Sequence, residues 1–154
     1  PQAVSFLNQP DGELATLTDG ARQALIAQLV DLLKSMKPEE VYVTYRHDKH
    51  PDHEEAAQLV RAAIDQAGLS IQLMEYPIWS LYQPLNFDFR APEFRTLHRL
   101  PIQAVRAQKL RAITCHRSQY EPIPPDTHGG LPKGFIERLS SPYEFFFVSS
   151  SSRR

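Results

Sequence analysis

The sequence predicts an α/β domain in which crossover helices cover a mostly parallel sheet. Helical and strand-like segments alternate through the first half of the chain. The segment 41–45 is β-branched and aromatic with apolar residues toward both faces, which is typical of an interior strand in a parallel sheet. The 154 residues are 42% hydrophobic, which suits a single domain with a sizeable core.

The first half is divided into elements by its apolar spacing and its end signals. Thr18 or Asp19 can cap a helix by accepting from first-turn amides, Pro51 suits the first position of a helix, and Gly68 suits a helix end. The predicted elements are an extended segment at 4–7, a helix at about 18–37, a strand at 41–45, a helix at 51–67 and a strand at 71–76.

Aromatic residues and prolines dominate the segment that follows, which predicts a long loop or irregular hairpin able to form one wall of a site. Its aromatic residues are Trp79, Tyr82, Phe87, Phe89 and Phe94. The remaining predicted elements are a short strand at 96–100, a helix at about 103–114, a short helix at 134–139 and a strand at 143–148. Residues 149–154 are predicted to be a disordered tail.

Composition excludes several classes of function. The 17 basic and 18 acidic residues give a net charge of −1 without a basic run, which argues against nucleic acid as a partner. No apolar stretch approaches the roughly 18–20 residues of a membrane span. The single cysteine, Cys115, cannot form an internal disulfide and favours a reducing compartment, so the cytoplasm is the expected location.

Three of the six histidines, His47, His50 and His53, lie in a charged loop between a predicted strand and a helix. Ligands bind at this edge of open α/β sheets. The helix dipole disfavours an imidazolium at His53, and a neutral imidazole is the form that binds metal. A catalytic zinc typically takes three protein ligands, so this loop cannot supply the whole set. Spacing alone also allows a solvated connection with good capping residues.

A motif in this loop resembles the second signature of the PIG-L/LmbE-like zinc deacetylases. It is Asp-Lys-His-Pro-Asp-His at 48–53, placed after a strand and before an alanine-rich helix. Three further features resemble the family in the same order: Tyr-Pro-Ile-Trp at 76–79, the helix end at 109–119, and Tyr-Glu-Phe-Phe at 143–146. Because the four features span nearly the whole chain, they are more specific together than any one of them.

The resemblance implies a Rossmann-like α/β domain that removes an N-acetyl group from an N-acetylglucosamine-type sugar conjugate, as a zinc-dependent hydrolase of a linear amide. His53 corresponds to a zinc ligand. His50 corresponds to the histidine that protonates the leaving amine or stabilises the oxyanion. Asp52 is expected to orient a histidine, and Asp48 matches the leading acidic position of the signature, with no role specified.

The resemblance also points to residues of the substrate pocket. His116 and Gln119, together with Ser118, match the family's third motif and are expected near the pocket. Trp79 is expected to line it, with specificity residing in the aromatic segment 77–94. The implied substrate is a small acetylated amino sugar.

The family's first signature, His-Pro-Asp-Asp, is not in this sequence. It carries two zinc ligands and the aspartate base, whereas His-Pro-Asp occurs here only at 50–52 and no Asp-Asp pair exists. Residues 1–148 are therefore interpreted as the C-terminal part of one deacetylase domain without its N-terminal βαβ part. The chain alone is expected to be inactive, with the remaining Zn²⁺ ligands on the other part. An exposed sheet edge would favour association with that part or with a second copy.

Two other interpretations stay open at this stage. A sugar-binding or assembly domain could keep the deacetylase fold without its chemistry. The pair His47-Asp48 also occurs in metal-dependent phosphohydrolases, but those proteins are mostly helical, whereas this sequence alternates helix and strand.

Overall fold

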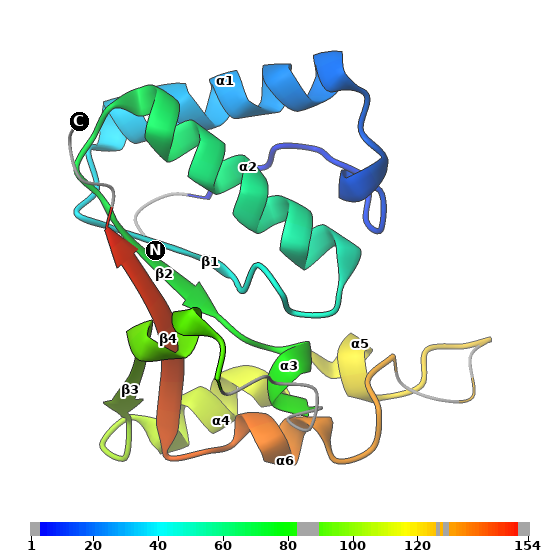
Figure 1. The fold of residues 1–154 in the computed structure, drawn as a ribbon. Helices are drawn as coiled ribbons and strands as arrows, with labels where there is room; N and C mark the ends of the chain where they lie inside the picture. The colour runs from blue at the N-terminus through cyan, green and yellow to red at the C-terminus, as the bar shows by residue number, and fades with distance from the viewer. Residues whose placement is uncertain (1–3, 83–89, 126, 128–129, 151–154) are drawn as a thin grey trace.

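The computed structural model describes residues 4–82, 90–125, 127 and 130–150. Figure 1 shows a four-stranded sheet with two long helices at one end and several short helices at the other. The strands are β1 (Glu40–Thr44), β2 (Gln72–Tyr76), β3 (Leu97–Pro101) and β4 (Tyr143–Ser150). The helices are η1 (Leu14–Thr16), α1 (Asp19–Met36), α2 (Pro51–Ala67), α3 (Trp79–Tyr82), η3 (Pro92–Thr96), α4 (Arg106–Thr114), α5 (Arg117–Tyr120) and α6 (Phe135–Leu139).

The sheet has the strand order β1-β2-β4-β3. Strands β1 and β2 are parallel, whereas β4 runs antiparallel to both β2 and β3. The predicted α/β class with flanking helices is confirmed, but only the first strand pair is parallel. Within the described residues β1 pairs on one side only, so it is an edge strand and the predicted interior position is wrong. Its two faces differ: Val43 is buried, while Tyr42 is 53% exposed.

The ends of both long helices lie where local signals predict them. The hydroxyl of Thr18 accepts a hydrogen bond from the Ala21 amide at the start of α1. Pro51 opens α2, where its missing N–H costs nothing. Gly68 ends α2 in the left-handed conformation, with φ at 65°.

Helices α1 and α2 pack against each other and α2 packs on β1, which places the main core on one face of the sheet. The fully or nearly buried members of this core are Leu25, Ile26, Val30, Leu33, Val43, Ala57, Leu59, Ala63, Ile64, Ile71 and Leu73. A second packing centre forms around Phe147, which is 1% exposed. Its ring stacks on Tyr45 at a centroid distance of 4.1 Å and meets the edge of Phe94 at 5.3 Å.

The second half of the chain departs from the predictions in two places. Strand β4 continues through Ser150, since Ser149 lies opposite Leu73 and Ser150 opposite Gln72 in the antiparallel register. The predicted tail is therefore wrong for Ser149 and Ser150, and its other residues, 151–154, lie outside the described part. In the aromatic segment the structure has α3 and η3, while Phe87 and Phe89 lie outside the described residues.

None of the helices in the described part of the chain has both the length and the apolar character needed to cross a bilayer.

Substitution Phe147→Ala tests the second packing centre. Removing this buried ring leaves a cavity beside Tyr45 and Phe94, so the free energy of unfolding should fall by about 3–5 kcal/mol. Urea unfolding followed by circular dichroism measures this loss. The control Leu100→Ala changes a side chain that is 51% exposed on β3 and should cost less than about 1 kcal/mol. Equal losses in the two variants would contradict the packing described.

Candidate functional site

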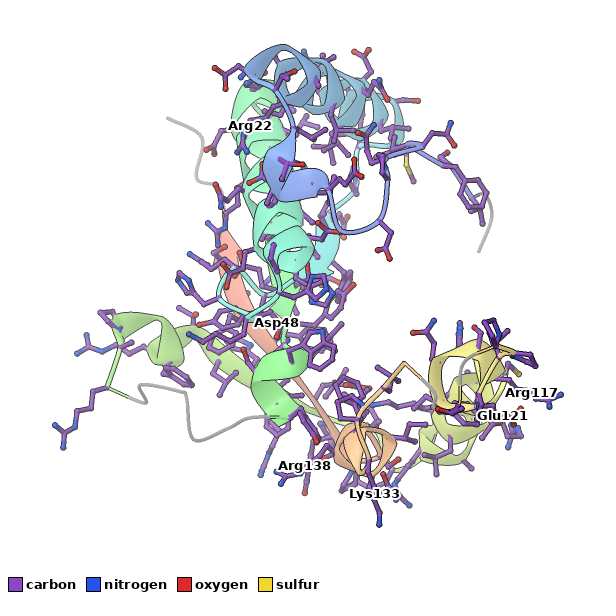
Figure 2. All side chains as sticks on the ribbon, turned by 90° about the vertical axis from the view of Figure 1, so that its right-hand side faces the viewer. Arg22, Asp48, Arg117, Glu121, Lys133 and Arg138 are labelled. Atoms are coloured by element: carbon purple, nitrogen blue, oxygen red, sulfur yellow. The ribbon has the colours of Figure 1, made fainter. Side chains whose placement is uncertain are left out.

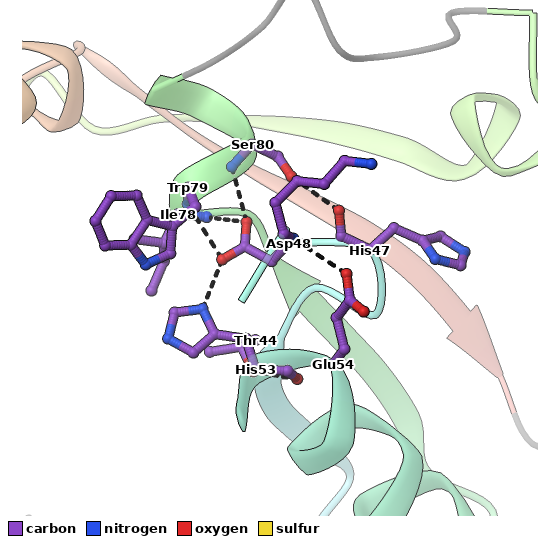
Figure 3. Close-up of polar contacts among 9 residues, drawn as sticks. Thr44, His47, Asp48, His53, Glu54, Ile78, Trp79 and Ser80 are labelled. Carbon is purple, nitrogen blue, oxygen red and sulfur yellow. Dashed lines mark hydrogen bonds and ion pairs between the residues drawn. The ribbon is translucent and has the colours of Figure 1, made fainter. Parts of the chain in front are cut away.

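Two loops meet at the carboxyl end of the parallel strand pair. The loop after β1 leads into α2, and the segment after β2 leads into α3. Because β1 and β2 are parallel and in register from Glu40–Gln72 to Thr44–Tyr76, both loops leave the same edge of the sheet. Figure 3 shows Asp48 of the first loop facing Ile78, Trp79 and Ser80 of the second.

Asp48 is fully buried and its carboxylate accepts four hydrogen bonds. Oδ1 accepts from the amides of Ile78 at 2.8 Å and Ser80 at 3.0 Å. Oδ2 accepts from the Trp79 amide at 3.1 Å and lies 2.6 Å from Nδ1 of His53. Burial alone would raise the pKa of Asp48, but the bonds from His53 and the three amides together lower it below its ordinary value. Asp48 is therefore a carboxylate at neutral pH.

His53 is fixed by this carboxylate on one side and by the helix on the other. It lies in the first turn of α2, and its backbone carbonyl accepts a hydrogen bond from the Thr44 hydroxyl at 2.9 Å. A hydrogen bond from Nδ1 to ionised Asp48 puts the ring proton on Nδ1, which leaves the lone pair of Nε2 free. Metal-binding histidines commonly donate their other N–H to a carboxylate in this way.

His50 stands beside His53 at the N-cap of α2. The centroids of the two imidazole rings are 4.5 Å apart and the rings are tilted by 30°. Nδ1 of His50 is buried and has no hydrogen-bond partner among the described residues. An unpaired buried nitrogen is uncommon, so this atom is available to hydrogen-bond a group outside the described residues.

Among the described residues the hydrogen bonds of Asp52 go to backbone amides and not to a histidine, contrary to the prediction. Its carboxylate accepts from the amide of Gly12 at 2.6 Å through Oδ2 and from the amide of Leu14 at 3.0 Å through Oδ1. At the second position of α2 its side chain points toward the turn that precedes η1. Asp52 therefore ties the N-terminal turn to the start of α2, and the histidine partner is Asp48.

Trp79 forms an aromatic wall next to His50. The two rings are nearly parallel, at 18°, with centroids 6.3 Å apart. The Trp79 ring also meets Phe135 of α6 at 4.9 Å and Tyr82 at 6.4 Å. The aromatic cluster thus joins α3 and α6 beside the histidine pair, where the sequence predicted a pocket wall.

His116 and Gln119 are not brought to the histidine pair by the described structure. Both side chains are exposed at the start and within α5, and the Gln119 carbonyl accepts locally from the Leu131 amide at 2.8 Å. In Figure 2, Arg117 and Glu121 of the same helical turn lie well away from Asp48. The third histidine of the loop, His47, points away from His53 in Figure 3.

Two supporting residues were not identified from the sequence. The Ser80 hydroxyl donates to the carbonyl of His47 at 3.0 Å, and Thr44 holds the carbonyl of His53. Ser80 lies 33 residues from His47 along the chain, so no local signal connects the two. Both supporting residues fasten the backbone on either side of Asp48.

The donor set for a metal is partial. Within the part of the chain that the structure describes, no three His, Cys, Asp or Glu side chains come together to hold an ion. His53 fits one ligand position, because its Nδ1 is occupied by Asp48 and Nε2 is left as the donor. The described residues can therefore supply one ligand of a metal site but not the complete set of ligands.

Two comparisons place this arrangement among known proteins. Residues 2–64 match the family model of PIG-L, described as GlcNAc-PI de-N-acetylase, and this range contains Asp48, His50 and His53. The crystal structure of the conserved protein TT1542 from Thermus thermophilus is similar over 96% of this chain, with a TM-score of 0.62 and 25% identity. The chain spans 65% of that protein's chain. The resemblance to PIG-L is thus confirmed over residues 2–64, and the α/β fold over nearly the whole chain.

Asp48→Asn tests the buried carboxylate. An amide has one oxygen where the carboxylate has two, so buried amide donors of the 78–80 segment lose their acceptor, and the free energy of unfolding should fall by more than about 2 kcal/mol. Chemical unfolding measures the loss. Glu54→Gln is the matched control: Glu54 accepts from the Lys49 amide at 3.1 Å at the surface, and this change should cost less than about 0.5 kcal/mol. A neutral effect of Asp48→Asn would show that its hydrogen bonds do not hold the two loops.

Proposed function

We propose that this chain provides the His50–His53 part of a zinc-dependent N-deacetylase acting on an acetylated amino-sugar conjugate. The observation that carries the proposal is the Asp48–His53 hydrogen bond of 2.6 Å, which leaves the lone pair of Nε2 of His53 available to a metal ion. The PIG-L match over residues 2–64 supports the reaction class, since it includes this loop.

His53 would hold the zinc ion through Nε2. When bound, zinc would act as a Lewis acid toward the amide carbonyl. Asp48 keeps the ring of His53 in one tautomer and one orientation, so that the donor atom is available without rearrangement. The hydrogen bonds from three backbone amides to Asp48 prevent this carboxylate from turning toward another partner.

His50 supplies the proton chemistry in this proposal. Hydrolysis of an amide releases an amine, which leaves readily only when its nitrogen gains a proton. The His50 ring lies beside His53 and against Trp79, and its buried Nδ1 makes no hydrogen bond to another described residue. It therefore has the freedom to donate a ring proton to the amine nitrogen as the C–N bond breaks, while Trp79 forms one wall for the sugar.

The other zinc ligands and the base that activates water are proposed to come from outside the described residues. The family's His-Pro-Asp-Asp signature is not present in the sequence, and the described side chains include no cluster of three possible ligands. Residues 1–148 would then be the C-terminal part of one deacetylase domain. The chain by itself would have little or no activity.

A sugar-binding or assembly role is the second candidate. The aromatic cluster of Trp79, Tyr82 and Phe135 favours it, because flat aromatic faces suit a sugar ring whether or not hydrolysis follows. The two candidates differ in one respect, which is zinc-dependent release of acetate.

His53→Ala tests the deacetylase proposal in a protein that joins this chain to a His-Pro-Asp-Asp part. Loss of the Nε2 donor should lower both zinc affinity and kcat/KM for acetate release from N-acetylglucosamine conjugates by more than about 100-fold. Zinc competition with a chromophoric chelator and an acetate assay provide the two readouts. His47→Ala is the control, since this ring points away from the site, and it should leave both values unchanged.

Two results would count against the proposal. Stoichiometric zinc and full activity in this chain alone would contradict a divided ligand set. Sugar binding with no acetate release in the joined protein, even with zinc bound, would favour the binding role instead.

A further inference from the structure

A groove of about 590 Å³ lies where the end of β2 and the start of β4 meet α3, α4 and α6. Side chains alternate between faces along β4: Phe147 packs on Tyr45 at the α2 side, whereas Phe146 meets the exposed Tyr42 on the other side, at 5.6 Å. Phe146 lines the groove together with Tyr76 of β2. The groove is therefore separate from the histidine pair, although both adjoin the segment after β2.

The groove is walled by three helices and is mostly apolar. Ile78 and Leu81 border it near α3, Ile113 comes from α4 and Leu139 from α6. Its volume is within the roughly 300–1,000 Å³ typical of small-molecule pockets, which combine apolar walls with a few polar groups. The groove thus has the size and the lining of a ligand pocket rather than of a flat surface patch.

One cation at the rim of the groove, the exposed Arg138, is not engaged by a carboxylate of the described residues. Nζ of Lys109 lies 2.6 Å from the Glu144 carboxylate, so these two charges offset each other. Arg138 of α6 also lines the groove, and no carboxylate among the described residues pairs with it. A ligand with an apolar body and one anionic group would complement this lining.

We infer that this groove binds a small amphipathic anion, with its apolar body over Ile78, Ile113 and Phe146 and its anionic group at Arg138. The inference does not rest on the deacetylase proposal, because the lining of the groove includes neither His50 nor His53. The inferred site is a second ligand site, which adjoins the segment after β2 but has neither histidine in its lining.

Two fluorescent probes of similar shape test the site on the full chain. Anilinonaphthalene sulfonate is an apolar aromatic anion, and N-phenylnaphthylamine is its neutral counterpart. Both should bind saturably with one site per chain. Arg138→Ala should weaken binding of the sulfonate by about threefold to tenfold and leave the neutral probe unchanged, since only the charge pairing is lost.

Ile113→Glu should weaken both probes by at least about tenfold, because it places a carboxylate in the apolar lining. The matched control is Leu32→Glu in a different apolar groove, of about 260 Å³, between α1 and β1. This control should leave both affinities unchanged. Circular dichroism checks the fold of each variant, and if Ile113→Glu does not fold, the surface variant Arg138→Ala decides.

Three results would overturn the inference. Loss of probe binding in Leu32→Glu but not in Ile113→Glu would place the probe in the groove beside β1. Equal binding of the sulfonate to the parent chain and to Arg138→Ala would show that Arg138 does not bind the anionic group. Absence of saturable binding of both probes would remove the site.

Discussion

The buried carboxylate of Asp48 is the constraint on which the rest of the site depends. A charge withdrawn from water is strongly destabilising unless hydrogen bonds replace its hydration. Asp48 obtains these bonds from three successive amides after β2 and from His53 in α2. A single side chain thus fixes the relative positions of the β1 loop, the start of α3 and the first turn of α2.

The same constraint explains why a histidine and an aromatic wall stand together. The backbone amide of Trp79 is one of the donors to Asp48. The same hydrogen bond therefore fixes the backbone from which the Trp79 side chain extends beside His50. Asp52 then ties the turn at Gly12 to the other side of the same helix start. The first turn of α2 is held by tertiary contacts on both sides, which gives His53 a defined orientation.

A second buried carboxylate, Glu75 of β2, stabilises the strand pair behind the site. It is fully buried and meets Nε of Arg46 at 2.7 Å and Nε of Arg61 at 2.6 Å. Arg46 follows β1 and Arg61 belongs to α2, so Glu75 joins β2 to the end of β1 and to α2. Removing either partner of such a pair leaves an uncompensated buried charge, which makes this region sensitive to substitution.

Local chemistry predicted the ends of α1 and α2 and the position of the histidine loop, because Thr18, Pro51 and Gly68 act within a few residues of themselves. The role of Asp48 was beyond such signals, since its amide partners lie about 30 residues away. Asp52 was paired with the wrong partner for the same reason, as its true partners lie 38 and 40 residues away. The insertion of β4 between β2 and β3 is likewise a long-range pairing that the pattern of a single strand does not specify.

The position of the ring proton on His53 reports whether Asp48 fixes the tautomer of this ring. Long-range proton–nitrogen correlation spectra, recorded at a pH where the ring is neutral, distinguish the two tautomers. A proton on Nδ1, held by Asp48, is expected, together with a shift of the Nε2 resonance when zinc is added to the protein that joins this chain to a His-Pro-Asp-Asp part. A proton on Nε2, with Nδ1 unprotonated, would contradict this expectation.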